Sequence, residues 1–346
     1  MFTDDIIQNR KFRFNRRKNI MKRIIAMLLA VVMVFALCAC SNGGDNGGTD
    51  AKDDGKADLT FTTGGEQGTY YAFGTVLAQQ VSDKTATNVT AIVSKGSQAN
   101  VEDLQANGAQ LGFVQSDVMS YAYNGEKLFD GNKITDFSVV AALYMEQVQI
   151  ITLDSSIKTV ADLKGKTVSI GAKGSGVYFN ALDLLGAYGL TENDIKAEYL
   201  DFGDSADSLK DGKIDAAFIV AGAPTPAVQD LGTGKQVYLV SLDKEHIDSL
   251  IASSPYYKEY TIAKDVYGTP EDVTTVAVAA VIIARNDVSE AAIYNFVSAV
   301  FNNIDEIGHA KKSELSIDFA SSISDVPYHP GAAKYFAEKD ITVKTA

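Results

Sequence analysis

Two glycine-rich segments contain the residue types and spacing in this sequence that are best suited to binding chemistry. Gly64 to Tyr71 and Gly171 to Tyr178 each follow a predicted strand and open a predicted helix. A helix N-terminus presents unpaired backbone N–H groups and a partial positive charge, so it can hold an anion. Glycines in addition let the backbone approach a ligand closely. The two segments therefore predict a site for a small, negatively charged solute.

The residues expected at this site lie in these glycine corners and at the predicted carboxyl ends of strands, where open α/β sheets bind their ligands. Charge-assisted hydrogen bonds contribute about 1.5–3 kcal/mol each, so a few hydroxyls and N–H groups could hold an anion. The candidate ligand-binding residues are Gly68, Thr69, Tyr70, Ser97, Asn100, Gln115, Asp117, Tyr144, Ser175, Gly176, Gly222 and Ala223.

Several of these candidates have a structural alternative. Tyr70 could be a core residue at helical spacing. Ser97, Asn100 and Asp117 could be only helix caps. Gly222 and Ala223, which precede a proline, could form a plain turn.

Few cations are available to hold an anion. Lys95 and Lys173 lie next to glycine corners, and Arg285 is the single arginine after residue 39. The sequence does not establish whether any of these three reaches the site.

The sequence lacks the motifs of the common catalytic sites, and we expect neither an enzyme nor a cofactor or metal site. His246, His309 and His329 do not have the His-Glu-x-x-His spacing of a metal site. Ser175 lies in Gly-Ser-Gly rather than in the Gly-x-Ser-x-Gly of a nucleophile elbow. Neither glycine corner has the spacing of a nucleotide-binding loop. A membrane-anchored hydrolase is the remaining enzymatic alternative.

Length and composition indicate a folded protein with more than one core. The chain has 346 residues, 46% hydrophobic and 22% charged, which is long for a single core and typical of a globular protein. Its formal net charge of −13 argues against nucleic acid as a partner, because phosphate binding needs clustered Lys and Arg.

The first forty residues have the pattern of an export signal. A basic Met21-Lys22-Arg23 precedes an apolar run that ends in Leu37-Cys38-Ala39-Cys40. This run is shorter than the roughly 20 residues of a membrane span. We predict a signal peptide at 1–39 with Met21 as the true start, although Met1 stays open. Residues 40–57, rich in Gly, Asn and Asp, are predicted to form a flexible tether.

Short β-rich runs alternate with helical stretches from Leu59 onward, which is typical of parallel sheets flanked by helices. Predicted strands cover 59–63, 89–93, 111–114, 139–143, 148–153 and 274–283, and predicted helices cover 69–82, 98–107 and 289–304. The pattern restarts near Lys166. An offset of 107 residues relates Gly64 to Gly171, Gly96 to Gly203 and Gln115 to Gly222. We therefore expect two similar lobes, one from 58–145 with about 275–346 and the other from 146–274.

Short motifs along residues 58–340 together resemble the TAXI family of solute-binding subunits of TRAP transporters. The matching segments are Gly64-Gly65, Gly68 to Tyr71, Gly96-Ser97, Asn100, Gln115 to Asp117, Leu143 to Glu146, Val160 to Lys166, Gly174 to Gly176, Asp211 to Ala216, Pro255 to Tyr257 and His329 to Ala332. Val177 and Asp340 depart from the pattern of that family.

The resemblance implies an α/β, two-lobed periplasmic-binding-protein-like fold of type II, in which each lobe is a sheet flanked by helices and the ligand cleft lies between the lobes. It implies a monomeric extracytoplasmic protein that captures a small organic anion or amino acid, of the class of glutamate, glutamine and related 2-oxo acids, by hinge closure. The protein would deliver that solute to a permease driven by an ion gradient. The Leu-x-Ala-Cys ending resembles a bacterial lipobox, which implies lipidation, palmitate included, at Cys40 and anchoring to the cell membrane. The alternative is a two-lobed substrate-binding lipoprotein of an ABC importer.

Overall fold

The computed structural model describes residues 53–345. The predicted signal peptide, the lipidation site at Cys40 and most of the predicted tether lie outside the described residues. Within residues 53–345, no helix is long and apolar enough to cross a membrane.

The first group of elements builds a parallel sheet edge with helices between its strands. Its elements in chain order are β1 (Ala57–Thr62), α2 (Thr69–Lys84), β2 (Thr87–Ile92), α3 (Ser97–Gln105), β3 (Leu111–Gln115) and α4 (Ser116–Asn124). Strand β1 pairs in parallel with both β2 and β3. All five residues of β3 are buried, as expected for a strand covered on both faces.

A second group repeats this arrangement later in the chain. It contains β5 (Thr167–Ser169), α5 (Gly176–Ala187), β6 (Lys196–Glu198), α6 (Phe202–Lys210), β7 (Ala216–Ala221), α7 (Pro226–Gly232), β8 (Tyr238–Leu239), α8 (Lys244–Ser253) and β9 (Lys258–Ile262). Strand β5 pairs in parallel with β6 and β7. The C-terminal part adds α9 (Glu290–Phe301), α10 (Ile317–Ala320) and α11 (Pro330–Ala337).

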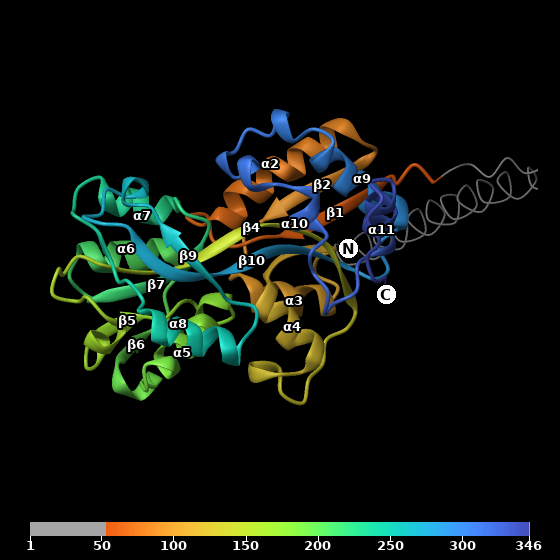
Figure 1. Cartoon of the computed structure of the whole chain (residues 1–346). Coiled ribbons are helices and arrows are strands. Elements are labelled where there is room, and N and C mark those ends of the chain that lie inside the picture. The colour runs from red at the N-terminus through yellow and green to blue at the C-terminus, as the bar shows by residue number, and fades with distance from the viewer. Residues whose placement is uncertain (1–52, 346) are drawn as a thin grey trace, which may run out of the picture. The chain divides into compact units, whose positions relative to one another are not determined.

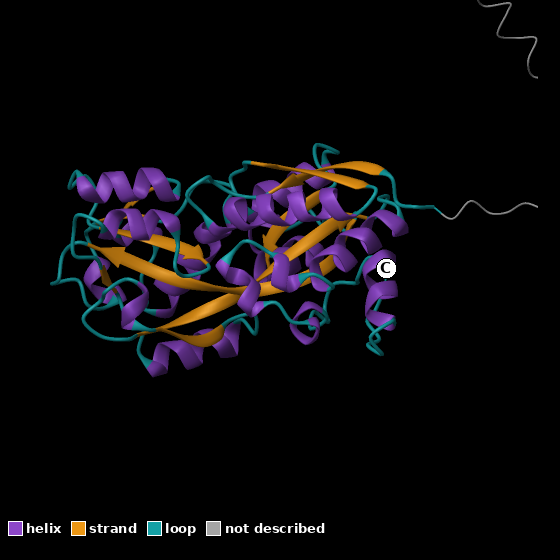
Figure 2. Cartoon of the chain, turned by 90° about the horizontal axis from the view of Figure 1, so that it is seen from above, coloured by secondary structure: helices purple, strands orange, loops and turns teal. Residues whose placement is uncertain are grey.

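Two long strands connect these groups, β4 (Phe137–Thr152) and β10 (Val273–Arg285). They pair with each other in antiparallel orientation, β10 also pairs with β3, and β4 also pairs with β7. Figure 1 shows both strands running from one group of helices to the other, and Figure 2 shows helices on both sides of the strands. The result is one mixed ten-stranded sheet whose main path is β2-β1-β3-β10-β4-β7-β5-β6.

This strand order has an internal symmetry. Reading inward from either end gives a second strand, a first strand, a third strand and then a long antiparallel strand. Helices α2 and α5 begin at Thr69 and Gly176, which differ by the 107 residues seen in the sequence. The sequence offset therefore corresponds to a repeated α/β unit.

The buried apolar side chains form separate clusters, and the division between two of them falls within the long strands β4 and β10. The largest cluster contains Tyr144 of β4 and Ala279 of β10, whereas a second cluster contains Val148 and Val278. A third cluster packs on the other face of the second group, around Ile151, Ile219 and neighbouring helices. Each group of elements therefore has its own core, and β4 and β10 contribute to both, as does α5, whose Phe179 packs in the largest cluster and whose Val177 packs in the second.

The prediction of separate strands at 139–143 and 148–153 is wrong. Tyr144, Met145 and Glu146 pair with Ala280, Ala279 and Val278 of β10, so the ladder continues through the predicted break. The expected parallel pairing holds among β1, β2 and β3 and among β5, β6 and β7, whereas β4 and β10 run antiparallel to their neighbours. The remaining predicted helices and strands occur within a few residues of their expected bounds.

Candidate functional site

A cavity of about 720 Å³ lies between the two groups of elements. Its wall includes the N-terminal ends of four helices, α2, α3, α5 and α6, together with the loops that precede them. Two of these helices come from each half of the repeat. The volume is in the range of small-molecule sites, and the converging helix N-termini supply a positive potential without many cationic side chains.

The first glycine corner leads from β1 into α2. The backbone N–H of Gly68 donates to the carbonyl of Gly65 over 3.0 Å, which closes the turn just before the helix. The Thr69 hydroxyl donates to the carbonyl of Gly222 over 3.0 Å and so reaches the other half of the protein. The Tyr70 ring stacks on Phe113 with centroids 4.5 Å apart. Gly68, Thr69 and Tyr70 all line the cavity, as predicted for ligand contacts.

The second glycine corner leads from β5 into α5. Gly171 and Gly174 have φ values of +88° and +90°, which residues other than glycine rarely adopt. Ser175 and Gly176 line the cavity, and Ser175 is the N-cap residue of α5 although its side chain makes no cap hydrogen bond. The Ser175 hydroxyl oxygen is buried without a partner among the described residues. This hydroxyl can therefore donate a hydrogen bond to a bound solute.

The second corner and helix α5 contact α3 and β3 of the other half. The N–H of Ala99 in α3 donates to the carbonyl of Gly174 over 2.9 Å. Gln115 packs so closely on Gly176 that a Cβ there would lie 1.5 Å from its Oε1 atom. The amide of Gln115 also donates to Oδ1 of Asn180 in α5 over 2.9 Å. The structure therefore has its two halves closed on each other.

Gln115 and Ser97 are connected at the cavity wall. The Ser97 hydroxyl accepts from the backbone N–H of Gln115 over 3.1 Å, which joins the start of α3 to the end of β3. Both residues line the cavity. Oε1 of Gln115 has no partner within residues 53–345, so it is available to accept from a solute.

Two of the predicted site residues are buried near the cavity without lining it. Asn100 accepts from the Thr62 hydroxyl and donates to the carbonyls of Thr63 and Phe113 at 2.6 and 2.7 Å. Its amide is therefore saturated by the protein itself. Asp117 accepts from Asn180 over 2.8 Å, and burial raises the pKa of its carboxyl group to about 7.

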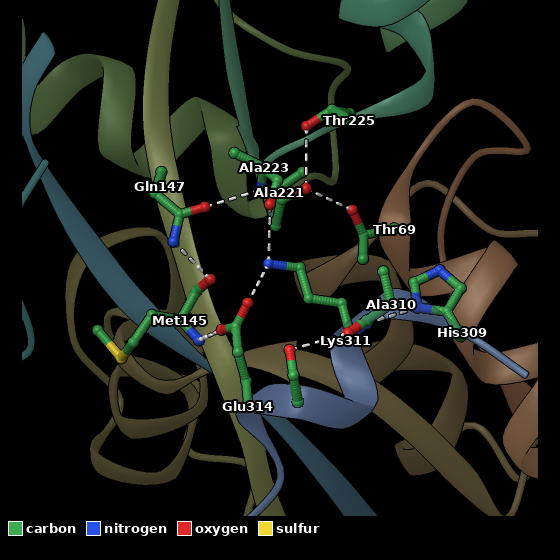
Figure 3. A network of polar contacts seen from close by, with 12 residues as sticks. Thr69, Met145, Gln147, Ala221, Ala223, Thr225, His309, Ala310, Lys311 and Glu314 are labelled. Carbon is green, nitrogen blue, oxygen red and sulfur yellow. Dashed lines mark hydrogen bonds and ion pairs between the residues drawn. The ribbon is translucent and has the colours of Figure 1, made fainter. Parts of the chain in front are cut away.

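Tyr144, Gly222 and Ala223 also lie outside the cavity wall and close to Lys311. Figure 3 shows Ala223 in the polar network around that lysine. The ammonium of Lys311 donates to the carbonyl of Ala223 over 3.0 Å, forms an ion pair with Glu314 and lies 5.3 Å from the centre of the Tyr144 ring. A Cβ at Gly222 would lie 2.3 Å from Cε of Lys311, so a larger residue there would displace the lysine side chain. The three predicted residues thus contact the protein's own lysine.

The cationic candidates differ in where they lie. Lys95 and Lys173 both line the cavity, and the ammonium of Lys173 lies 4.4 Å from the centre of the Tyr199 ring. Arg285 pairs with Asp287 and is not part of the cavity wall. The anion-binding potential of the site therefore comes from helix N-termini and lysines.

Several parts of the cavity wall were not among the predicted site residues, including the start of α6, the end of β7 at Val220 and Ala221, and Glu146. The start of α6 contributes Asp201, Phe202 and Gly203, and the offset that pairs Gly96 with Gly203 was a signal for it. Glu146 of β4 also lies in the wall; it ends the Leu143 to Glu146 segment that matches the family motifs, but it was not predicted as a ligand contact. Its carboxylate accepts from the Tyr70 hydroxyl over 2.6 Å, and burial raises its pKa to about 8.

The described residues at this cavity offer hydrogen-bonding groups. No group of three or more His, Cys, Asp or Glu in residues 53–345 could hold a metal ion. The Ser175 hydroxyl has no histidine or lysine as a hydrogen-bond partner that could activate it. Hydrogen-bond donors and acceptors line the wall, and they suit a solute that is held and released.

Comparison with known proteins gives one family and one fold. A family model described as the NMT1-like family matches residues 61–339. A protein of Bordetella bronchiseptica has a similar structure with a TM-score of 0.50, 17% identity and coverage of 82% of this chain and 89% of that chain. The periplasmic aliphatic sulphonate binding protein SsuA from Escherichia coli has a TM-score of 0.41 and 18% identity, with 75% of each chain covered.

The GluR0 ligand-binding core from Nostoc punctiforme in complex with L-glutamate has a TM-score of 0.45 and 16% identity, and the match covers 74% of this chain and 96% of that chain. At such identities these likenesses concern the fold alone. The expected α/β, two-lobed fold of the periplasmic-binding-protein type is confirmed.

Proposed function

Because this chain belongs to the NMT1-like family and has a two-lobed binding-protein fold, we propose that it is an extracytoplasmic solute-binding protein. It captures a small organic anion or amino acid and delivers it to a membrane transporter. The observation that carries this proposal is the 720 Å³ cavity onto which four helix N-termini from both halves converge.

The proposed ligand contacts come from both corners. The Ser175 hydroxyl and Oε1 of Gln115 are buried, line the cavity and have no partner among the residues described here. Leaving buried polar atoms unpaired costs about 1–3 kcal/mol each, and a solute that pairs with them recovers that free energy. Backbone N–H groups at the helix starts and the two lysines complete a site for a carboxylate.

Capture would proceed by rotation of the two lobes about β4 and β10. The proposed lobes are 58–145 with about 275–346, and 146–274, and their boundaries fall within these two strands. Opening would break the bonds from Ala99 to Gly174 and from Gln115 to Asn180. A solute that bonds to both corners binds the closed form better, and this differential affinity shifts the population toward closure.

The type of transporter is the finer part of the proposal. The family match does not show the TAXI assignment, so the proposal of a TRAP permease as partner is supported by the motif resemblance alone. A substrate-binding lipoprotein of an ABC importer needs only the two-lobed fold, and we place it first. In either case the chain would be exported, lipidated at Cys40 and held near the membrane as a monomer.

Thermal-shift screening of organic anions and amino acids, followed by scattering measurements with and without the best solute, tests the proposal. A one-site solute at 100 times its dissociation constant stabilises the protein by about 2.7 kcal/mol. Replacing Ser175 and Thr69 together by Ala should abolish the shift without unfolding the free protein. A protein that binds no small solute, or binds one equally well after both substitutions, would contradict this site.

The transporter type has its own test. The chain is expressed in cells together with the permease whose gene lies next to its own. Solute uptake is then measured after ATP depletion and, separately, after collapse of the ion gradients. Loss of uptake only on ATP depletion supports the ABC importer, and loss only on gradient collapse supports the TRAP permease.

A further inference from the structure

Glu146 is a buried carboxyl group in the wall of the binding cavity. It lies on β4, paired with Val278 of β10, at the point where the long strands pass from one lobe to the other. Only 2% of its surface is exposed, yet it is part of the cavity wall. A carboxyl group at this depth faces the solute rather than bulk water.

The protein gives this carboxyl group little compensation for a negative charge. One oxygen, Oε2, accepts from the Tyr70 hydroxyl. The nearest cation, Lys311, bonds to Ala223 and Glu314 instead. Within the described part of the chain, no salt bridge involves Glu146. A buried charge without a partner is unfavourable, so such a group either binds a proton or meets a cation.

The groups that face Glu146 come from four elements. They are Tyr70 of α2, Asp117 of α4, Tyr144 of β4 itself and Lys311 of the 3-10 turn Ala310–Glu314. The pKa of Glu146 is raised to about 8, mainly by burial; the hydrogen bond from Tyr70 lowers it in part, the nearby Asp117 raises it, and Lys311 lowers it. At pH 7 the carboxyl group of the unliganded closed protein is therefore mostly protonated.

The rest of the wall has the opposite character. Helix N-termini, Lys95 and Lys173 attract a negative group, whereas Glu146 offers a carboxyl oxygen. A solute with only negative groups would use the first set and leave Glu146 protonated. A solute that also has an ammonium group would pair with both sets.

We propose that Glu146 binds the protonated amino group of the solute, so that this site takes an amino acid in preference to the corresponding 2-oxo acid. This inference rests on the proposed function and narrows its solute class. The ammonium ion of the solute and the Tyr70 hydroxyl then both donate to the carboxylate, and the buried charge is paired.

Binding is accompanied by release of one proton for each Glu146 that was protonated. The O–H bond of the carboxyl group breaks and its proton goes to the solvent. The resulting carboxylate accepts hydrogen bonds from the ammonium group of the solute, which keeps its own protons. With a pKa of about 8 in the free protein, roughly 0.9 proton leaves at pH 7, following ordinary titration. Affinity for an amino acid then rises about tenfold per pH unit below pH 8 and levels off above it.

Titration calorimetry of the full mature protein tests this in two buffers that differ in ionisation enthalpy. L-glutamate and 2-oxoglutarate form one matched pair of probes, which differ only in the amino and oxo groups. The other L-amino acids, screened first by thermal shift, extend the set with their 2-oxo acids. We expect tighter binding of the amino acid, release of about 0.9 proton at pH 7, and no proton release with the 2-oxo acid.

Two variants separate this role from a structural one. Glu146→Gln keeps the size of the side chain and an oxygen that can accept from Tyr70, and we expect amino-acid affinity to fall at least ~30-fold with 2-oxo-acid affinity little changed. Glu146→Asp keeps a carboxylate and should retain both proton release and the preference for the amino acid. Thermal melts of both variants check that they fold.

The possible failures can be told apart. Unchanged amino-acid affinity in Glu146→Gln would overturn the inference, and so would wild-type protein that binds only solutes without an amine, such as 2-oxoglutarate or methylphosphonate. In those cases the proposed solute-binding function stands. If the wild type binds no small solute at all, the proposed function itself fails and this inference fails with it.

Discussion

Gly176→Ala should weaken solute binding while leaving the unliganded fold intact. Gly176 is the first residue of α5, and a Cβ there would lie 1.5 Å from Oε1 of Gln115 and 2.9 Å from the hydroxyl oxygen of Ser97. Both of those residues belong to the other lobe. The clash therefore exists only when the lobes are closed, and an open protein should accommodate the alanine.

The size of the effect follows from the contacts that must be given up. Gln115 has to leave its position, which breaks its hydrogen bond to Asn180 and leaves a buried acceptor without that donor. An orphaned buried acceptor costs about 1–3 kcal/mol. A central value of about 2 kcal/mol corresponds to roughly a 30-fold loss of affinity.

The matched control is Gly186→Ala, ten residues further along the same helix. A Cβ at Gly186 would meet nothing within 4 Å. Alanine is favoured over glycine in a helix interior by about 1 kcal/mol, so this variant should be slightly more stable and bind normally. Titration calorimetry with the solute found in the thermal-shift screen measures both affinities. Equal affinities for the two variants would refute the closed contact between Gly176 and Gln115.

Three further outcomes are expected. Lys311→Met should lower the free energy of unfolding by about 1–3 kcal/mol, because the buried ammonium bonds to the carbonyl of Ala223 and pairs with Glu314. The exposed Lys312→Met is the control and should change this free energy little, and denaturant titrations measure both. Tyr70→Phe removes a hydrogen-bond donor that lowers the pKa of Glu146, so the pH at which amino-acid affinity levels off should move above 8. Calorimetry at a series of pH values measures this, and an unchanged pH profile would contradict the hydrogen bond between Tyr70 and Glu146. The unliganded protein should lose stability as pH rises from about 4.5 to 8, because the folded state binds more protons than the unfolded state where the pKa values of Glu146 and Asp117 are raised, and Glu146→Gln should flatten that slope in melts at a series of pH values.

The glycine corners and most of the elements could be predicted from the sequence because they depend on local properties. Short β-rich runs that alternate with helical stretches indicate β1, β2, β3 and the helices between them, and the offset of 107 residues relates the two halves. Seven of the twelve predicted ligand contacts line the cavity, namely Gly68, Thr69, Tyr70, Ser97, Gln115, Ser175 and Gly176. These residues begin helices or end strands, and such positions have recognisable sequence signals.

The other five predicted contacts show where local reasoning fails. Asn100 has the right type and position, but its amide bonds within the protein. Asp117 accepts from Asn180 through Oδ2 and lies outside the cavity wall, although its Oδ1 atom has no partner among the described residues. Tyr144 and the Gly222-Ala223 turn contact Lys311, which lies 88 residues beyond Ala223. A sequence motif shows that a polar group is present. It does not show which distant group has already taken its hydrogen bonds.

The sequence by itself determined the repeated α/β units, the glycine turns and the helix starts that suit an anion, because turn geometry and periodicity are properties of neighbouring residues. Only the tertiary structure decided that residues 137–152 form one continuous strand, because its pairing partner β10 is more than a hundred residues away. It also decided that Glu146 is buried in the cavity wall, because burial there requires both lobes, and with burial came the raised pKa.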